Sequence, residues 1–254
     1  MYCNIFDSHA HYDDEAFAED RFTLLDSLFK NGVIGFVNCG SDLNSSKKSL
    51  EIARRYSGVY AAAGIHPHEA EKAGETDLKE IEALLNDDKC VAVGEIGLDY
   101  HYDFSPRDRQ KEIFEYQLSL ANKYSLPVII HDREAHEDTL NLLKKYRPKG
   151  VVHCFSGSAE MAKEIYKLGM YIGISGVVTF KNARKLPDVV KEMPMDRFLL
   201  ETDAPYLAPV PFRGKINNSS LIYYSAEKIG EIRGISTEDV LKYAMDNTKR
   251  LYNL

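Results

Sequence analysis

Short apolar runs recur along the chain, and most are followed by a stretch in which apolar positions recur at helical spacing. Each run is rich in β-branched or small apolar residues and ends in polar or glycine-containing sequence, as a buried strand does. The pattern predicts eight strands, at about residues 2–6, 33–39, 59–65, 91–94, 127–130, 150–152, 171–174 and 197–200. It predicts helices at about residues 15–31, 43–56, 75–87, 106–124, 135–146, 159–168, 182–193, 219–233 and 236–252.

Strands that alternate with helices in this way form a parallel sheet with right-handed crossovers. Eight such units, spaced roughly 20 to 35 residues apart, favour an α/β fold of the closed (β/α)8 TIM-barrel type. A doubly wound open sheet is the alternative. The sequence shows no linker, low-complexity tract or strict repeat, so we expect residues 1–254 to form a single barrel domain.

The composition is that of an ordinary globular protein, with 254 residues of which 44% are hydrophobic and 28% charged. No apolar run approaches the ~18 residues that a membrane span needs, and no signal peptide is evident, so we expect a cytoplasmic protein. Cys3, Cys39, Cys90 and Cys154 show no Cys-x-x-Cys spacing, and we expect reduced thiols. The net charge of −7 argues against a broad basic face that coats nucleic acid, but it permits a local basic patch or a bound metal ion.

Metal-ligating residue types stand where the predicted strands end. His9 and His11 lie two residues apart after the first strand, so both imidazoles face one side at a spacing of ~7 Å. A lone His-x-His pair is more often an ordinary pair of histidines, and a lone acidic residue after a strand is more often a helix cap. Six such residues on one rim make a stronger pattern, because active sites of this barrel lie at the C-terminal face of the strands. The six are His9, His11, Glu95, His131, His153 and Asp203.

Six ligands exceed the four that one tetrahedral zinc uses, and they suit two divalent cations that share a bridging carboxylate. Glu95 is the best bridge, because it is the one carboxylate from the middle of the ring. We expect His9, His11, Glu95 and Asp203 to hold one ion, and Glu95, His131 and His153 to hold the other. Asp203 then acts as general base toward an activated water. The ligand set leaves the metal open among Mg²⁺, Mn²⁺ and Zn²⁺.

Five motifs together resemble the TatD-related metal-dependent deoxyribonucleases, a branch of the amidohydrolase-type barrels. They are residues 7–11 (DSHAH), 64–68 (GIHPH), 94–100 (GEIGLDY), 153–157 (HCFSG) and 201–206 (ETDAPY), and the resemblance covers essentially the whole chain. It implies a (β/α)8 barrel, a divalent-metal centre on the six positions above, and hydrolysis of DNA phosphodiesters, often from the 3′ end.

One segment departs from the family pattern, which usually has Arg-Gly-Lys followed by Asn-Glu-Pro after the last strand. Here Arg213 and Lys215 are present, but Asn217-Asn218-Ser219 follows. Arg213 and Lys215 can still bind phosphate, the first as a planar fork and the second as a point charge. The altered segment affects substrate preference more than chemistry, or it is a changed cap for the next helix.

Further polar residues flank the predicted rim. His66 ends the third strand, and we consider it either a hydrogen-bond donor to the scissile phosphate or leaving oxygen, or a packed or capping histidine. Asp99 and Arg133 are candidates for orienting the imidazoles, whereas Asp132 is expected to be structural. His68 is expected on the loop surface, and Tyr102 could contact a nucleotide but is more simply an ordinary tyrosine.

The leading functional hypothesis is a metal-dependent hydrolase that cleaves DNA from its ends, as a 3′–5′ exonuclease, with Asp203, Glu95 and His66 as catalytic residues. His66, Arg213 and Lys215 would hold the substrate phosphate. The alternative is hydrolysis of a C–N or carboxyl-ester bond, as in amidohydrolases or an aminoacyl-tRNA deacylase. A minor alternative is a non-enzymatic metal-binding protein, which would predict a lost ligand. DNA ends are the expected partner, with no membrane and no obligate protein partner.

Overall fold

The computed structural model describes residues 4–254, with eight strands at the centre. Each strand pairs in parallel with the next along the chain. Tyr2 and Cys3, for which we predicted a strand and a reduced thiol, lie outside the described residues. The strands are β1 (Ile5–Ala10), β2 (Val33–Cys39), β3 (Val59–Ala63), β4 (Cys90–Asp99), β5 (Val128–Arg133), β6 (Gly150–Val152), β7 (Tyr171–Ile174) and β8 (Phe198–Leu200).

The sheet closes because the chain beyond β8 continues beside β1. The hydroxyl of Ser8 donates to the carbonyl of Leu200 at 3.0 Å, and the amide of Asp203 donates to the carbonyl of His9 at 3.0 Å. A parallel bridge joins Ala10 to Ala204, and the His11 amide donates to the Ala204 carbonyl at 2.7 Å. The predicted (β/α)8 barrel is therefore confirmed, and the open doubly wound sheet is excluded.

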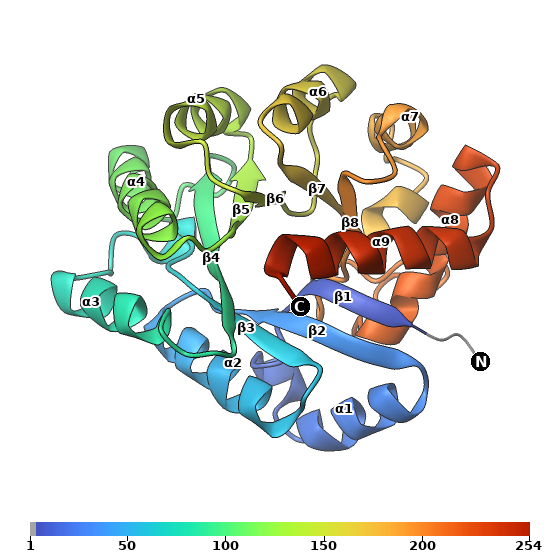
Figure 1. The fold of residues 1–254 in the computed structure, drawn as a ribbon, viewed down its shortest axis with the longest axis horizontal. Helices are drawn as coiled ribbons and strands as arrows, with labels where there is room; N and C mark the ends of the chain where they lie inside the picture. Colours follow the sequence, from blue (N-terminus) through green and yellow to red (C-terminus); the bar gives the residue numbers. More distant parts are fainter. Residues whose placement is uncertain (1–3) are drawn as a thin grey trace.

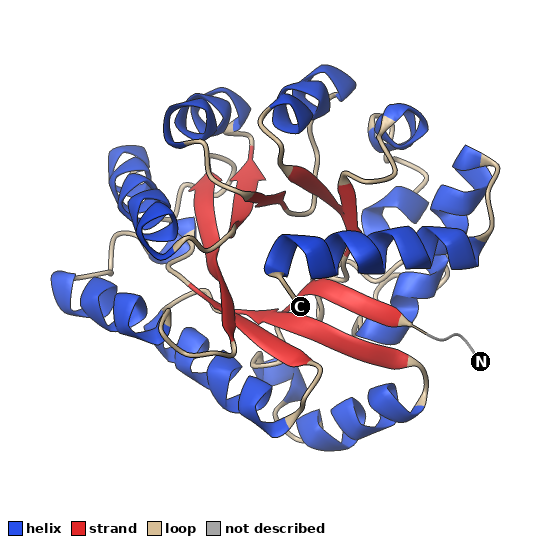
Figure 2. Cartoon of the chain, in the orientation of Figure 1, coloured by secondary structure: helices blue, strands red, loops and turns tan. Residues whose placement is uncertain are grey.

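Helices surround the strands on the outside, as Figures 1 and 2 show. The last helix, α9, lies across the ring beside β1 and β8 in Figure 1. Within residues 4–254, none of the helices combines the length and apolar character needed to cross a bilayer. The α-helices are α1 (Arg21–Lys30), α2 (Leu43–Arg55), α3 (Glu75–Leu84), α4 (Arg107–Tyr124), α5 (His136–Tyr146), α6 (Ala159–Lys167), α7 (Leu186–Glu192), α8 (Ile222–Arg233) and α9 (Thr237–Tyr252). Short 3-10 helices are η1 (Glu15–Phe17), η2 (Pro67–Glu69), η3 (Gly176–Thr179) and η4 (Ser219–Leu221).

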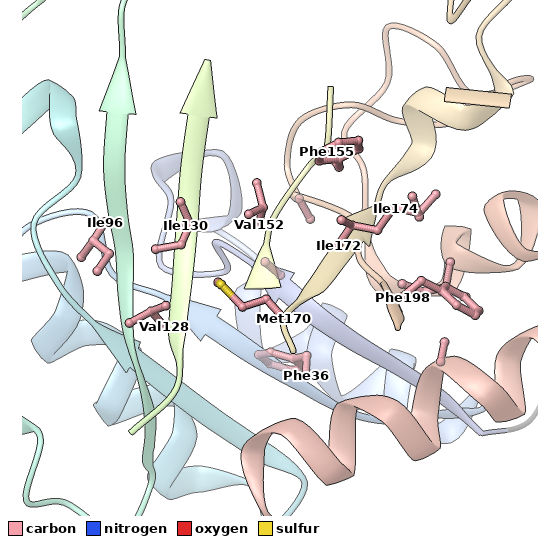
Figure 3. Close-up of a cluster of buried hydrophobic side chains, with 14 of the residues drawn as sticks. Phe36, Ile96, Val128, Ile130, Val152, Phe155, Met170, Ile172, Ile174 and Phe198 are labelled. Carbon is pink, nitrogen blue, oxygen red and sulfur yellow. The ribbon is translucent and has the colours of Figure 1, made fainter. Parts of the chain in front are cut away.

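Alternate strand residues serve two separate cores, because successive side chains point to opposite faces of a strand. Ile130 and Val152 belong to the large cluster between strands and helices, part of which Figure 3 shows. Their neighbours Ile129 and Val151 belong to a second cluster together with Leu199 and Tyr252. Ile129 and Val151 precede His131 and His153 by two residues, so this second cluster lies beneath those two histidines and supports them.

Three predicted boundaries differ from the structure in ways that concern the site. The helix predicted from residue 15 begins at Arg21, because Asp14 caps the separate turn η1 instead. The helix predicted at 182–193 is shortened to α7, with Pro187 in its first turn, where a proline is tolerated. The fourth strand does not end at residue 94 but extends to Asp99, so Glu95 lies within β4 and not in the loop after it.

Candidate metal centre

The six predicted ligands converge at the C-terminal ends of the strands. On one side of the cluster, Nε2 of His9 lies 3.3 Å from Oε2 of Glu95 and 3.5 Å from Oδ1 of Asp203. Nε2 of His11 lies 3.4 Å from each of the same two oxygens. The four side chains that we assigned to the first ion therefore face one another across a single small volume.

The second carboxylate oxygen of Glu95 faces a different set of imidazoles. Its Oε1 lies 2.8 Å from Nδ1 of His131 and 2.8 Å from Nε2 of His153. Nε2 of His66 lies 3.4 Å from the same oxygen. Glu95 thus directs one oxygen to each side, which is the arrangement that a bridging carboxylate requires.

The donor set fits divalent cations. Among residues 4–254, three groups have ligand atoms within 4.8 Å of one another: His9 with Glu95 and His153, His9 with His11 and Asp203, and His66 with Glu95 and His131. Imidazoles and carboxylates are the ligand types that Zn²⁺ and Mn²⁺ accept. The Nε2 atoms of His9 and His11 lie only 3.0 Å apart, so both lone pairs can point at one ion. The structure also places the His66 imidazole next to Glu95 and His131, two of the ligands predicted from the sequence.

The Glu95 carboxylate is buried, yet its surroundings favour the ionised form. Burial alone raises its pKa, but the surrounding imidazoles of His153, His66 and His9 outweigh burial and hold the pKa well below the ordinary value. Burial lowers the pKa of His66 to about 4, so this imidazole is neutral near pH 7. The Nδ1 atom of His66 accepts a hydrogen bond from the amide of His68 at 3.2 Å, which places the proton of the neutral ring on Nε2.

Groups behind the imidazoles fix their orientation. Nδ1 of His11 donates to the carbonyl of Cys39 at 2.8 Å, which fixes the ring so that Nε2 faces Glu95 and Asp203. The Cys39 thiol lies 3.4 Å from Nδ1 of His9. Cys39, Cys90 and Cys154 are free thiols, as expected from their spacing.

Asp99, at the end of β4, orients His131 as we expected. Its Oδ2 lies 3.1 Å from Nε2 of His131 and 2.8 Å from Nε2 of His68. Burial raises the pKa of Asp99, but hydrogen bonds from His131, the Tyr102 amide and His68 outweigh it and hold the pKa below its usual range. His68 is consequently part of the site wall, which corrects our expectation that it lies on the loop surface.

Glu201 is a buried partner of the site that sequence reasoning missed. Its Oε1 accepts a hydrogen bond from the amide of Cys154 and lies 3.7 Å from Nδ1 of His153. Gly173 on β7 makes room for this carboxylate, since a side chain there would collide with it. Within residues 4–254, Oε2 of Glu201 and Nδ1 of His153 are buried without a hydrogen-bond partner. The available signal was an acidic residue immediately after β8, two residues before Asp203.

Asp7 and the departing segment form a buried network under the ligands. Oδ2 of Asp7 accepts hydrogen bonds from the hydroxyls of Thr202 at 2.5 Å and Ser219 at 2.7 Å. Burial raises the pKa of Asp7 to about 7, although these bonds oppose the rise. Asn217 donates to the carbonyl of Thr202 at 2.9 Å, and Asn218 caps η4. Residues 217–219 therefore cap η4, and they also hold the chain at Thr202, the residue before Asp203, through a hydrogen bond.

A cavity of about 710 Å³ opens above the ligands. Among the described residues that line it are His66, His68, Tyr102, Arg133 and Tyr206, but not Arg213 or Lys215. The Arg213 guanidinium instead lies 3.8 Å from the ring centre of Phe180. Arg133 lies over the ring of Tyr102 and contacts no imidazole through its side chain, in contrast to the orienting role that we considered for it.

Comparison with known proteins places this arrangement in a family. Residues 6–253 match the family described as TatD related DNase. The chain is 43% identical to the uncharacterized metal-dependent hydrolase YabD of Bacillus subtilis, over 98% of this chain and 99% of that protein. It is 33% identical to the 3′-5′ ssDNA/RNA exonuclease TatD of Erwinia tasmaniensis, over 98% of this chain and all of that protein (100%). The crystal structure of YjjV, a TatD homologue from Escherichia coli, superposes with a TM-score of 0.93 at 33% identity, and 99% of each chain is covered.

Proposed function

Because this chain belongs to the TatD-related DNase family of metal-dependent hydrolases, we propose that it hydrolyses DNA phosphodiester bonds from a strand end, as a 3′–5′ exonuclease. The observation that carries the proposal is the position of Glu95. Its two oxygens face two separate sets of imidazole and carboxylate donors at the base of one open cavity. Two cations bridged by one carboxylate are the usual arrangement for phosphodiester hydrolysis.

The ligands would be divided between two sites. His9, His11, Glu95 and Asp203 would hold one cation, and Glu95, His131 and His153 would hold the other. Divalent cations bound there would neutralise charge on the phosphate and lower the pKa of an attacking water.

Asp203 and His66 would handle the protons. Asp203 keeps its carboxylate ionised, because the imidazoles of His11, His153 and His9 outweigh burial and lower its pKa, so it can accept the proton of the attacking water. The neutral His66 carries its proton on Nε2, beside Glu95, and can donate it in a hydrogen bond to a phosphate oxygen. Arg213 and Lys215 lie outside the lining of the cavity, and they remain candidates for a more distant phosphate.

The charge distribution suits the end of a strand better than a long duplex. The net charge is −7, so few surface phosphate contacts are available for tracking along DNA. A strand end needs only the centre and its immediate walls.

The test is a time course on an end-labelled single-stranded DNA oligonucleotide with Mg²⁺, Mn²⁺ or EDTA, and a matching RNA oligonucleotide. Asp203→Asn is compared with Asp188→Asn, a control on the exposed surface of α7. We expect a metal-dependent ladder that shortens from the 3′ end in wild type and in the control, and at least a hundredfold loss in Asp203→Asn. Intact DNA from folded, metal-loaded protein would overturn the proposal and would direct attention to acyl and amide substrates.

A further inference from the structure

An aromatic and cationic stack borders the cavity: Arg133 and Tyr102 line it, and Phe104, which is not part of the lining, stacks on Tyr102. The guanidinium of Arg133 lies 4.7 Å from the ring centre of Tyr102, and the ring of Phe104 stacks on Tyr102 at 5.2 Å with an interplanar angle of 17°. Arg133 and Phe104 therefore both pack against the ring of Tyr102. Tyr102 is 47% exposed and Phe104 is 62% exposed, so both rings are accessible from solvent.

The Arg133 side chain has unused hydrogen-bonding capacity. Within residues 4–254 its guanidinium makes neither a hydrogen bond nor an ion pair, and it packs over the ring of Tyr102. Of the described residues that line the cavity, it is the one lysine or arginine, whereas seven are carboxylates. They are Asp13, Asp14, Glu69, Glu95, Asp99, Asp132 and Asp203. A planar fork of free N–H donors in this position is suited to an incoming anion, which it can bind through two parallel hydrogen bonds.

The stack is held at a fixed position relative to the metal ligands. Asp99 and Arg133 are opposed residues on the adjacent strands β4 and β5, which Figure 1 shows side by side. Asp99 contacts His131 through one carboxylate oxygen, and its other oxygen accepts the Tyr102 amide at 2.9 Å. His68, bound to the same Asp99, packs in T-shaped geometry against both Tyr102 and Phe104. The Asp99 carboxylate therefore contacts both the predicted ligand His131 and the backbone of Tyr102 in the aromatic stack.

From these contacts we infer that Arg133, Tyr102 and Phe104 form a subsite for the nucleotide adjacent to the scissile phosphodiester, an inference that rests on the proposed function. Arg133 binds the phosphate of that nucleotide, and the free face of Phe104 stacks on its base. Tyr102 positions Arg133. The substrate class that uses both parts is an oligonucleotide with at least one phosphate beyond the bond that is cut, and base stacking makes the subsite tolerant of sequence.

The first experiment compares two substrates, a trinucleotide of DNA and the p-nitrophenyl ester of a 5′-mononucleotide, which lacks the flanking phosphate. We expect Arg133→Ala to raise KM for the trinucleotide at least about tenfold, as for one charge-assisted contact, with a much smaller change for the ester. Arg133→Lys should recover part of the loss, because it keeps the charge without the fork. Phe104→Ala should likewise raise KM for the trinucleotide more than for the ester, because the ester lacks the flanking nucleotide whose base stacks on Phe104.

Arg55→Ala and Phe22→Ala are the matched controls. Arg55 stacks on Phe22 at 3.8 Å, as Arg133 does on Tyr102, but neither residue lines the cavity. An equal KM for the trinucleotide in wild type and Arg133→Ala would overturn the subsite while leaving the proposed function intact.

Fluorescence anisotropy of a labelled single-stranded oligonucleotide, measured on the same proteins, separates the subsite from the catalytic proposal. Binding by wild type that weakens about tenfold in Arg133→Ala, without cleavage by either, would support the subsite and overturn the nuclease. Neither binding nor cleavage by wild type would overturn both.

Discussion

The hydroxyl of Ser219, at the start of η4, donates a hydrogen bond of 2.7 Å to the carboxylate of Asp7 on β1. The amide of Ser219 donates in turn to the phenol of Tyr12 at 2.8 Å. A residue near the end of the chain thus satisfies a buried carboxylate close to its beginning. The segment Asn217-Asn218-Ser219 therefore helps to connect the first strand with the chain that follows the last.

Ser219→Ala should destabilise the fold. The buried Asp7 carboxylate would lose one of its donors, and an unsatisfied buried acceptor costs about 1–3 kcal/mol. The measurement is the free energy of unfolding in denaturant, with EDTA present so that metal binding does not contribute. Ser119→Ala, which removes an exposed hydroxyl on α4, is the control and should stay within about 0.5 kcal/mol of wild type. Equal stability of the two variants would show that the Ser219 contact contributes little.

Gly173→Ala should weaken metal binding without removing a ligand. A methyl group at this position occupies the place of the Glu201 carboxylate and displaces it from Nδ1 of His153. Loss of a partner behind a metal-bound histidine commonly costs about 10–100-fold in metal affinity or activity. Metal content at limiting free Mn²⁺ or Zn²⁺ is the measurement. Gly74→Ala is the control, because its added Cβ would make only an ordinary contact of 3.6 Å with the Asp77 side chain, and unchanged affinity in Gly173→Ala would refute the role of Glu201.

His136 on α5 should give the fold a small pH dependence. Its Nδ1 lies 2.7 Å from Oδ2 of Asp132, and this hydrogen bond raises the pKa of His136 above the ordinary 6.5. The protonated imidazole is therefore favoured in the folded state, and its contribution is complete below about pH 6.5 and declines as the pH rises through the folded pKa.

His136→Gln removes the titrating charge. Because the imidazole is half-exposed, we expect the stability difference from wild type to stay below about 1 kcal/mol. Unfolding free energies of both proteins at pH 6 and pH 9 are the measurement, at roughly these values because they bracket the titration. The difference should shrink at the higher pH, and a constant difference would contradict the assignment.

Divalent cations should stabilise the folded protein. A ligand that binds only the folded state at about a hundredfold excess over its Kd contributes about 2.7 kcal/mol. The melting temperature should therefore rise when Mn²⁺ or Zn²⁺ is added to EDTA-treated protein. In Glu95→Gln the increase should be much smaller, since the shared carboxylate is lost. An equal increase in both proteins would place the bound cation elsewhere.

Much of the architecture was predictable from local pattern. Each parallel strand is a short apolar run that ends in polar sequence, and the barrel brings those ends to one rim. His131 and His153 could therefore be placed near Glu95 without any knowledge of contacts. The family motifs added the order of the ligands along the chain.

What could not be predicted depends on contacts between distant residues. Glu201 resembles any acidic residue after a strand until Gly173, from the neighbouring strand, is seen to leave space for it. Arg133 lies two residues after the predicted ligand His131, at the end of β5, but that spacing gives no sign of its contact with Tyr102 in the loop after β4. Arg213 seemed suited to the substrate by its motif, yet it stacks on Phe180 outside the cavity lining. Hydrophobic periodicity carries no information about such pairs.

The contact between β1 and the chain after β8 also determines when, during synthesis of the protein, the site can form. The hydrogen bonds between Asp7 and Thr202 span 195 residues of chain, and Asp203 follows Thr202 directly. At a synthesis rate of about 5–20 residues per second, His9 and His11 leave the ribosome on the order of ten seconds or more before Asp203 does. The nascent chain thus carries a partial set of imidazoles and Glu95 while one carboxylate is still missing. A metal centre on the proposed ligands would therefore be complete only after synthesis of the last strand, when the barrel can close.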